Sequence, residues 1–309
     1  MYGNSFNRRD FLSILPSFSL TPMISKGSTL RYGRYPISCN AYNWVTFYQR
    51  DGKLWGKDPD QDIAEFASTG IKAFEPSFSD KEKALALIPV LRKYQIEMPS
   101  IYVNSVLHEK EGIEKSINTV LGIADVVKSY GTRIIVTNPS PISWGSKELK
   151  TDAQLIIQSQ ALERLGLELK KRGLTLAYHT HDMELRAGAR EFHHTLLNTD
   201  PENVSFCFDV HWIFRGSENS EVAVFDVLKL YGKRIVELHL RQSVNGIWSE
   251  SFANKGDIDY ERFALELARL NIKPHLVIEQ CLEAASPKKL DVVQAHIRDL
   301  EVVKATFLQ

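Results

Sequence analysis

Residues 174–181 read Leu-Thr-Leu-Ala-Tyr-His-Thr-His, and residues 204–211 read Val-Ser-Phe-Cys-Phe-Asp-Val-His. Two later runs have the same character, Ile-Val-Glu-Leu-His at 235–239 and His-Leu-Val-Ile-Glu at 275–279. Short apolar runs without regular polar alternation are typical of strands buried in a parallel sheet. Each run closes with a residue that can bind a metal ion. The sequence therefore predicts four such residues at the carboxyl end of one sheet.

Around these runs, strand-like and helix-like segments alternate from Pro36 to the end of the chain. The expected strands are 36–41, 71–75, 98–103, 133–137, 175–179, 204–209, 235–239 and 276–279. The expected helices are 59–68, 81–93, a long one ending near 130, 152–172, 190–197, 222–231, 260–270 and 287–304. Eight strand–helix units in one chain of this size predict an α/β fold, a single-domain (β/α)8 TIM barrel over residues 31–309.

The segment after the first expected strand helps to choose between two α/β folds. An open doubly wound sheet usually carries a glycine-rich phosphate loop there. This chain instead has an aromatic segment, which we expect to be a loop, with Trp44, Phe47, Tyr48 and Trp55. The barrel is therefore favoured over the open sheet.

Composition excludes some classes of function. The 309 residues are 43% hydrophobic and 25% charged, and 38 basic residues balance 38 acidic ones. Because the formal net charge is zero, no overall field would attract nucleic acid or an anionic membrane. Three cysteines, Cys39, Cys207 and Cys281, are too few for a disulfide framework.

The first 30 residues carry a different kind of pattern. Asn7-Arg-Arg-Asp-Phe-Leu12 resembles the twin-arginine export motif, and a short apolar stretch covers residues 11–24. The stretch is short and contains Pro16 and Pro22, so it is not expected to span a membrane as a helix. We expect an export signal and connector over residues 1–30 and a periplasmic location. The alternative is a cytoplasmic enzyme with a disordered tail.

The strand-end residues His179, Asp209, His239 and Glu279 together predict one divalent metal site. Two imidazoles and two carboxylates suit Mn²⁺, Co²⁺, Fe²⁺ or Zn²⁺ better than Ca²⁺, which prefers oxygen ligands alone. Mg²⁺ is a further alternative for the identity of the ion. A lone buried histidine is more often a hydrogen-bonded core residue. Four candidate ligands in consecutive strands favour a metal, at the end of the barrel where such enzymes keep their chemistry.

Five short motifs lie at or near these strand ends. They are Tyr178-His-Thr-His-Asp-Met-Glu184, Phe208-Asp-Val210, His239-Leu-Arg241, Lys255-Gly-Asp-Ile-Asp259 and Val277-Ile-Glu-Gln280. Together they resemble motifs of the sugar phosphate isomerase/epimerase family, whose barrel is xylose-isomerase-like and which includes inosose dehydratases, ketose 3-epimerases and endonuclease IV-type enzymes. The resemblance covers the chain from about Pro36 onward. It implies that the metal ligands are the four strand-end residues.

Two departures from the family pattern bear on mechanism. His179 stands where the ketose epimerases have a glutamate ligand that pairs with the last ligand as a two-base relay, so the resemblance implies asymmetric chemistry here. Many relatives also place a histidine three residues after the strand-six aspartate. This chain has Trp212 there and His211 one residue earlier. Trp212 is either a stacking wall for a sugar or a packed loop aromatic.

Further residues are candidates for catalysis or substrate binding. They are Glu75, His181, Arg241, Trp212, His211 and Asn138. His181 is two residues beyond His179 and points the same way on an extended strand; with Glu279 and Glu75 it is a candidate acid or base. Arg241 is a candidate anchor for an oxyanion or a sugar hydroxyl.

The expected function is metal-dependent isomerisation, epimerisation or dehydration of a small sugar or polyol next to a carbonyl, through an enediolate. The alternative is a hydrolase or lyase acting on oxidised (3-keto) sugars. An endonuclease IV-like activity and a non-catalytic sugar-binding barrel are less favoured. No nucleic-acid partner and no membrane span are expected, and homo-oligomerisation stays open.

Overall fold

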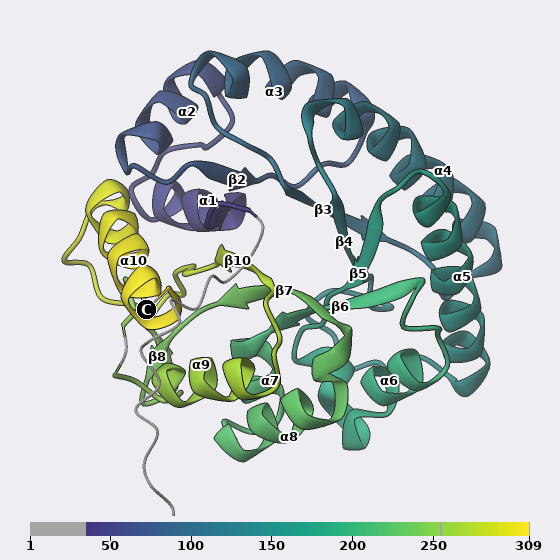
Figure 1. Ribbon diagram of the computed structural model, residues 1–309. Helices are drawn as coiled ribbons and strands as arrows, with labels where there is room; N and C mark the ends of the chain where they lie inside the picture. The colour runs from purple at the N-terminus through teal and green to yellow at the C-terminus, as the bar shows by residue number, and fades with distance from the viewer. Residues whose placement is uncertain (1–34, 254, 309) are drawn as a thin grey trace, which may run out of the picture.

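The computed structural model describes residues 35–253 and 255–308, which form an α/β barrel around eight parallel strands (Figure 1). The strands are β1 (Ser38–Asn40), β2 (Ala73–Glu75), β3 (Ser100–Ser105), β4 (Ile134–Pro139), β5 (Thr175–Tyr178), β6 (Val204–Asp209), β7 (Ile235–Leu240) and β10 (His275–Ile278). Their order in the sheet is β2-β1-β10-β7-β6-β5-β4-β3. Apart from β2 and β3, barrel strands that follow one another in the chain are neighbours, and the last strand, β10, pairs with the first, β1, which confirms the predicted TIM barrel.

The two outermost strands in this order are β2 and β3. Isolated backbone hydrogen bonds, rather than a regular ladder, join the segments of these two strands. The Phe74 amide donates to the Glu97 carbonyl at 2.9 Å, and the Tyr102 amide donates to the Pro76 carbonyl at 2.9 Å. These bonds bridge the remaining seam of a nearly closed barrel. The carboxyl ends of all eight strands therefore surround one opening.

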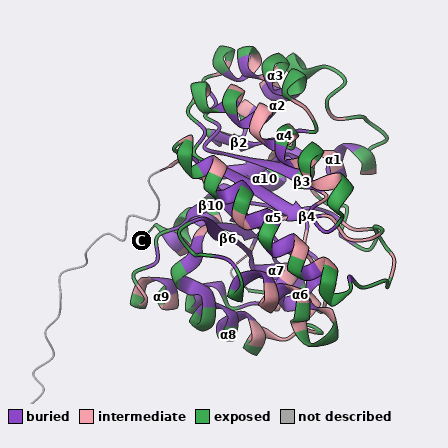
Figure 2. Ribbon diagram, turned by 90° about the vertical axis from the view of Figure 1, so that its right-hand side faces the viewer, coloured by how far each residue is buried: buried purple, intermediate pink, exposed green. Residues whose placement is uncertain are grey.

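Helices form an outer ring around the strands (Figure 1). They are α1 (Ala41–Arg50), α2 (Pro59–Ser68), α3 (Lys81–Lys93), α4 (Lys110–Val127), α5 (Asp152–Lys171), α6 (Arg186–Leu197), α7 (Val210–Gly216), α8 (Glu221–Tyr231), α9 (Tyr260–Arg269) and α10 (Val292–Phe307). Figure 2 shows buried strands inside and exposed residues on the outer faces of the helices. In α3, for example, Ala84, Ile88 and Leu91 are buried, at the spacing of one helix face.

The aromatic segment after β1 is a helix, α1, and the expectation of a loop is wrong. Asn40 caps the helix by accepting a hydrogen bond from the Tyr42 amide at 2.7 Å. Trp44 and Phe47 are fully buried. Their rings pack on His296 of α10, with centroid distances of 5.2 and 5.4 Å. This contact with the far end of the chain stabilises a helix that local sequence did not indicate.

Two insertions at strand ends were not predicted. Helix α7 starts directly after β6, where Asp209 caps it by accepting from the Trp212 amide at 2.7 Å. A hairpin, β8 (Ser243–Val244) and β9 (Ile247–Trp248), follows β7. Its turn residues Asn245 and Gly246 both have positive φ, as a tight two-residue hairpin requires. Both insertions place tryptophans near the barrel opening.

The expected export signal in residues 1–30 lies outside the described residues, so it stays a prediction. Within residues 35–253 and 255–308, none of the helices is both long and apolar enough to cross a membrane.

Candidate metal centre and active site

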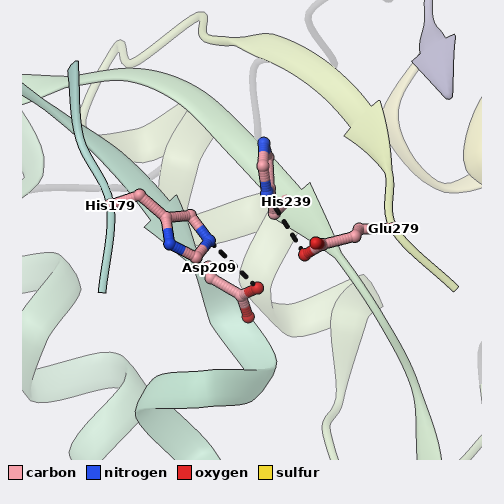
Figure 3. Close-up of side chains that lie close together, drawn as sticks. All are labelled: His179, Asp209, His239 and Glu279. Carbon is pink, nitrogen blue, oxygen red and sulfur yellow. Dashed lines mark hydrogen bonds and ion pairs between the residues drawn. The ribbon is translucent and has the colours of Figure 1, made fainter. Parts of the chain in front are cut away.

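The four predicted metal ligands converge at the carboxyl end of the barrel (Figure 3). His179 directly follows β5, Asp209 ends β6, His239 lies in β7 and Glu279 directly follows β10. Their ligand atoms all lie within 4.8 Å of one another, and all four side chains are buried. The register of the strands explains the cluster. Asp209 of β6 and Val277 of β10 both pair with His239 of β7, and Glu279 follows Val277 by two residues.

The donor atoms fit a divalent ion. His179 Nε2 lies 3.5 Å from Asp209 Oδ2, and His239 Nδ1 lies 3.2 Å from Glu279 Oε2. Two ligands about 2.1 Å from a tetrahedral ion lie about 3.4 Å from each other. His179 Nε2 and Asp209 Oδ2 are buried without a hydrogen-bond partner. Because buried polar atoms are normally satisfied, these two atoms are available to bind a cation.

The second nitrogen of His239 faces two buried carboxylates behind the cluster. Its Nε2 lies 3.1 Å from Glu75 Oε2 and 3.4 Å from Glu237 Oε1. Burial raises the pKa of Glu75, but the charge of His239 and hydrogen bonds outweigh burial and lower it to about 2. Burial and repulsion by Glu75 raise the pKa of Glu237 to about 8. Nε2 of His239 therefore faces these two carboxylates, and Nδ1 is the nitrogen directed at Glu279 and the other candidate ligands.

Arg241 holds Glu279 in place. Its Nη2 lies 3.0 Å from Glu279 Oε2, and its Nε donates to the Glu279 carbonyl at 2.8 Å. The guanidinium group lies between Trp248 and Trp212, 4.2 and 5.2 Å from their ring centroids. Burial would raise the pKa of Glu279, but Arg241 and His239 lower it well below its usual range. Arg241 thus keeps Glu279 ionised, and its Nη1 is buried without a hydrogen-bond partner.

A cavity of about 610 Å³ lies at the barrel opening next to these ligands. Its lining residues are Asn40, Tyr42, Ser77, Tyr102, Asn104, Trp144, Gly145, His181, Asp182, Met183, Arg186, Trp212, Trp248 and Glu279. The volume is in the range of small-molecule sites. Trp212 is in this wall, which agrees with the first of its two predicted alternatives, a stacking surface for a sugar.

His181 also lines the cavity. Its Nδ1 is buried without a hydrogen-bond partner. The ring contacts Trp144 and Trp212 at centroid distances of 5.3 and 5.4 Å. Burial and the nearby His179 lower the pKa of His181 well below its usual value. His181 is therefore neutral around pH 7.

Four residues predicted to act on or bind the substrate do not line this cavity: Arg241, Asn138, His211 and Glu75. Asn138 donates to Glu184 Oε1 at 3.0 Å and to the carbonyl of His179 at 3.2 Å, so it shapes the turn after β5. His211 is buried, and its Nε2 lies 2.8 Å from Ser243 Oγ. Glu75 lies behind His239. These side chains contact other protein groups around the site instead of facing the cavity, where the predicted contact with substrate would be made.

Sequence reasoning missed several residues of the cavity. Tyr102 lies in β3, and its hydroxyl is 3.3 Å from His179 Nδ1. The position of Tyr102 could have been predicted, because β3 ends at the same face of the barrel as the strands that carry the candidate ligands. The position of Trp248 could not have been predicted, because this residue reaches the cavity on the unpredicted hairpin after β7.

Comparison with known proteins defines the class. Residues 63–300 match the family described as "Xylose isomerase-like TIM barrel", and the chain belongs to this family. One relative is an inosose dehydratase of Mesomycoplasma hyopneumoniae strain 7448. It is 24% identical over 247 residues, which are 71% of this chain and 80% of the relative. By name, this relative is a sugar-modifying enzyme.

Solved structures share the fold at low sequence identity. The D-allulose 3-epimerase of Methylomonas sp. aligns with a TM-score of 0.66 and 14% identity, covering 91% of this chain and 100% of that one. The 3-keto-D-glucoside 4-epimerase of E. coli aligns with a TM-score of 0.62 and 14% identity, covering 88% and 100%. The IOLI protein, solved with a bound zinc atom, aligns with a TM-score of 0.61 and 13% identity, covering 89% and 100%.

Proposed function

We propose that the protein is a metal-dependent enzyme that isomerises, epimerises or dehydrates a small sugar or polyol at a carbon next to a carbonyl. The observation that carries this proposal is the convergence of four buried ligands beside a cavity that also contains the neutral His181. A divalent ion at the ligands would polarise the substrate carbonyl and so acidify the neighbouring C–H bond. The family and its sugar-modifying relatives support the same class of reaction.

We assign the proton transfer to two candidate residues. Glu279 and His181 both line the cavity. Glu279 Oε2 is occupied by Arg241 and His239, so a proton transfer by this residue uses Oε1. His181 is neutral and lines the cavity, so it is the second candidate for the proton transfer. His179 cannot take part, because its Nε2 is the atom directed at the ligand cluster. Chemistry at this site is therefore asymmetric.

The walls of the cavity suit a sugar ring. Trp144, Trp212, Trp248 and Tyr102 all line it. Flat aromatic faces bind the apolar C–H faces of sugars, and the edges of these rings carry N–H or O–H groups that can meet hydroxyls. Asn104 and Ser77 add polar groups to the same wall. This arrangement fits a small, neutral, polyhydroxylated substrate.

A second candidate is bond cleavage in an oxidised (3-keto) sugar. It is favoured by His179, a neutral ligand at the position where ketose epimerases have a carboxylate. One fewer negative charge makes a bound ion a stronger Lewis acid. Elimination or dehydration also needs only one base, which agrees with the asymmetric placement of His181 and Glu279.

The test combines metal analysis with a substrate screen. Purified protein is reconstituted with Mn²⁺, Co²⁺ or Zn²⁺ and assayed on inososes, ketoses and 3-keto-glycosides in deuterated water. Asp209→Ala should lose both metal and activity and keep the fold, whereas Asp226→Ala, on the exposed face of α8, should lose neither. Wild-type protein that retains none of the three ions would overturn the proposal. Deuterium in both epimers of an unmodified ketose would contradict the asymmetry.

A further inference from the structure

A second cavity lies beside the one at the metal centre. Its volume is about 500 Å³, which is ample for an aromatic ring or a small bicyclic group. It is bounded by the start of α1, the segment before α2, the first turns of α2, the end of β2 with the residues that follow it, and the first half of α3. The lining residues are Ala41, Tyr42, Val45, Trp55, Gly56, Pro59, Asp62, Ile63, Phe74, Pro76, Ser77, Phe78, Lys83, Ala86 and Leu87.

This second cavity is apolar, and its charged side chains have other partners. Asp62 Oδ2 accepts a hydrogen bond from the Gly56 amide at 2.7 Å. Lys83 Nζ donates to Ser79 Oγ at 2.9 Å and is largely exposed to solvent. The rest of the wall is mostly aliphatic and aromatic. A sugar ring placed here would bury hydroxyls with few partners, which is unfavourable, whereas an apolar group would gain from the burial.

The two cavities are adjacent. Tyr42 and Ser77 line both of them. Tyr42 is in the first turn of α1 and is 52% exposed, so its side chain stands at the boundary between the two cavities. One cavity offers metal ligands, a histidine and tryptophans, and the other offers an apolar wall. A single ligand with a polar and an apolar half would occupy both.

We propose that the substrate is a glycoside of an oxidised sugar that carries an aromatic aglycone. The sugar ring lies at the metal centre, and the aglycone lies in the apolar cavity between α1, α2 and α3. This inference rests on the proposed function, because that function requires a carbonyl in the sugar. An aglycone on the anomeric oxygen keeps the ring closed, so the carbonyl must be a ketone elsewhere in the ring. Free ketoses and aldoses are then poorer substrates.

The experiment compares the phenyl and methyl β-glycosides of 3-keto-glucose on the metal-loaded wild-type enzyme. Burial of the phenyl ring should raise kcat/KM about tenfold or more over the methyl glycoside. Ala86→Trp, on an exposed position of α3 that lines the cavity, should bring this ratio close to one. Leu85→Trp is the matched control, because Leu85 is exposed on the same helix but does not line the cavity; it should leave the ratio unchanged.

The outcomes separate this inference from the proposed function. Equal use of the two glycosides by the wild-type enzyme would overturn the aglycone site and leave the proposed function intact. If neither glycoside reacts, the inososes and ketoses of the screen decide about the proposed function, and binding of phenol to crystals of the protein decides about the cavity. Phenol beside Trp55 and Phe74 in the wild type, lost in Ala86→Trp, would support an apolar ligand site there. Phenol absent from that cavity would overturn it.

Discussion

His239 Nε2 lies 3.1 Å from the carboxylate of Glu75, on the opposite side of the imidazole from the nitrogen that faces Glu279. Asn40 donates to the same Glu75 oxygen at 2.6 Å and so holds the carboxylate toward the ring. A carboxylate behind a ligating histidine fixes the tautomer and makes the ring a stronger donor. Glu75, predicted as an acid or base, is thus placed to orient a metal ligand.

This relationship predicts the effect of Glu75→Gln. The change keeps the size of the side chain and removes the charge, so metal affinity should fall about 10- to 100-fold while the fold is retained. Competition with a chelator of known affinity measures it. Glu111→Gln, at an exposed position of α4, is the control and should bind metal as the wild type does. Unchanged affinity in Glu75→Gln would show that Glu75 only fills space.

His181→Asn should slow catalysis and leave the metal in place. Loss of a general base lowers kcat by about 10²- to 10⁴-fold, and KM should change little. Because burial and His179 hold the pKa of His181 well below its usual value, titration of this residue should not lower the wild-type kcat between pH 8 and pH 6. Steady-state kinetics on the substrate found in the screen checks both points. His194→Asn, on α6, is the remote control.

Glu184 should make stability depend on pH in one direction. Burial and the charge of Glu191 raise its pKa from 4.5 to about 7. The folded state then binds the proton more tightly than the unfolded state, so this contribution is fully present below about pH 4.5 and is lost as pH rises through about 7.

Comparison with Glu184→Gln isolates that contribution from the buried histidines, which titrate in both proteins. The free energy of unfolding of the wild type minus that of the variant should fall as pH rises from 4.5 to 7 and then level off. Urea denaturation at a series of pH values measures the difference. A constant or rising difference would contradict the prediction.

Two helix glycines should respond to alanine in opposite ways. A Cβ at Gly166 of α5 would lie 2.2 Å from the carbonyl oxygen of Asn203, so Gly166→Ala should destabilise the protein by about 1–3 kcal/mol. A Cβ at Gly122 of α4 would meet nothing within 4 Å. Gly122→Ala should therefore stabilise the protein by about 0.5–1 kcal/mol. Thermal unfolding of both variants tests the pair, and equal effects would contradict the packing of α5 on the segment before β6.

Local sequence pattern was sufficient to predict most strands and helices of the barrel. The buried run at 204–209 and the helices at 59–68 and 81–93 were predicted with the bounds that the structure shows. Hydrophobic periodicity and capping residues act within a few positions, so they can be read without the fold. The metal cluster was also predictable, because parallel strands in one barrel place their carboxyl ends on the same face.

Only the tertiary structure decided which side chains face the cavity. Helix α1 forms because Trp44 and Phe47 pack on His296, about 250 residues away in the chain. Glu75 ends β2 as predicted but turns to His239. Asn138, expected after the fourth strand, lies within β4 and donates to Glu184, and Trp248 reaches the cavity on an inserted hairpin. The sequence by itself determined the strand ends and the donors on them. Packing between distant elements determined where each side chain points, because that direction depends on neighbours that local pattern does not encode.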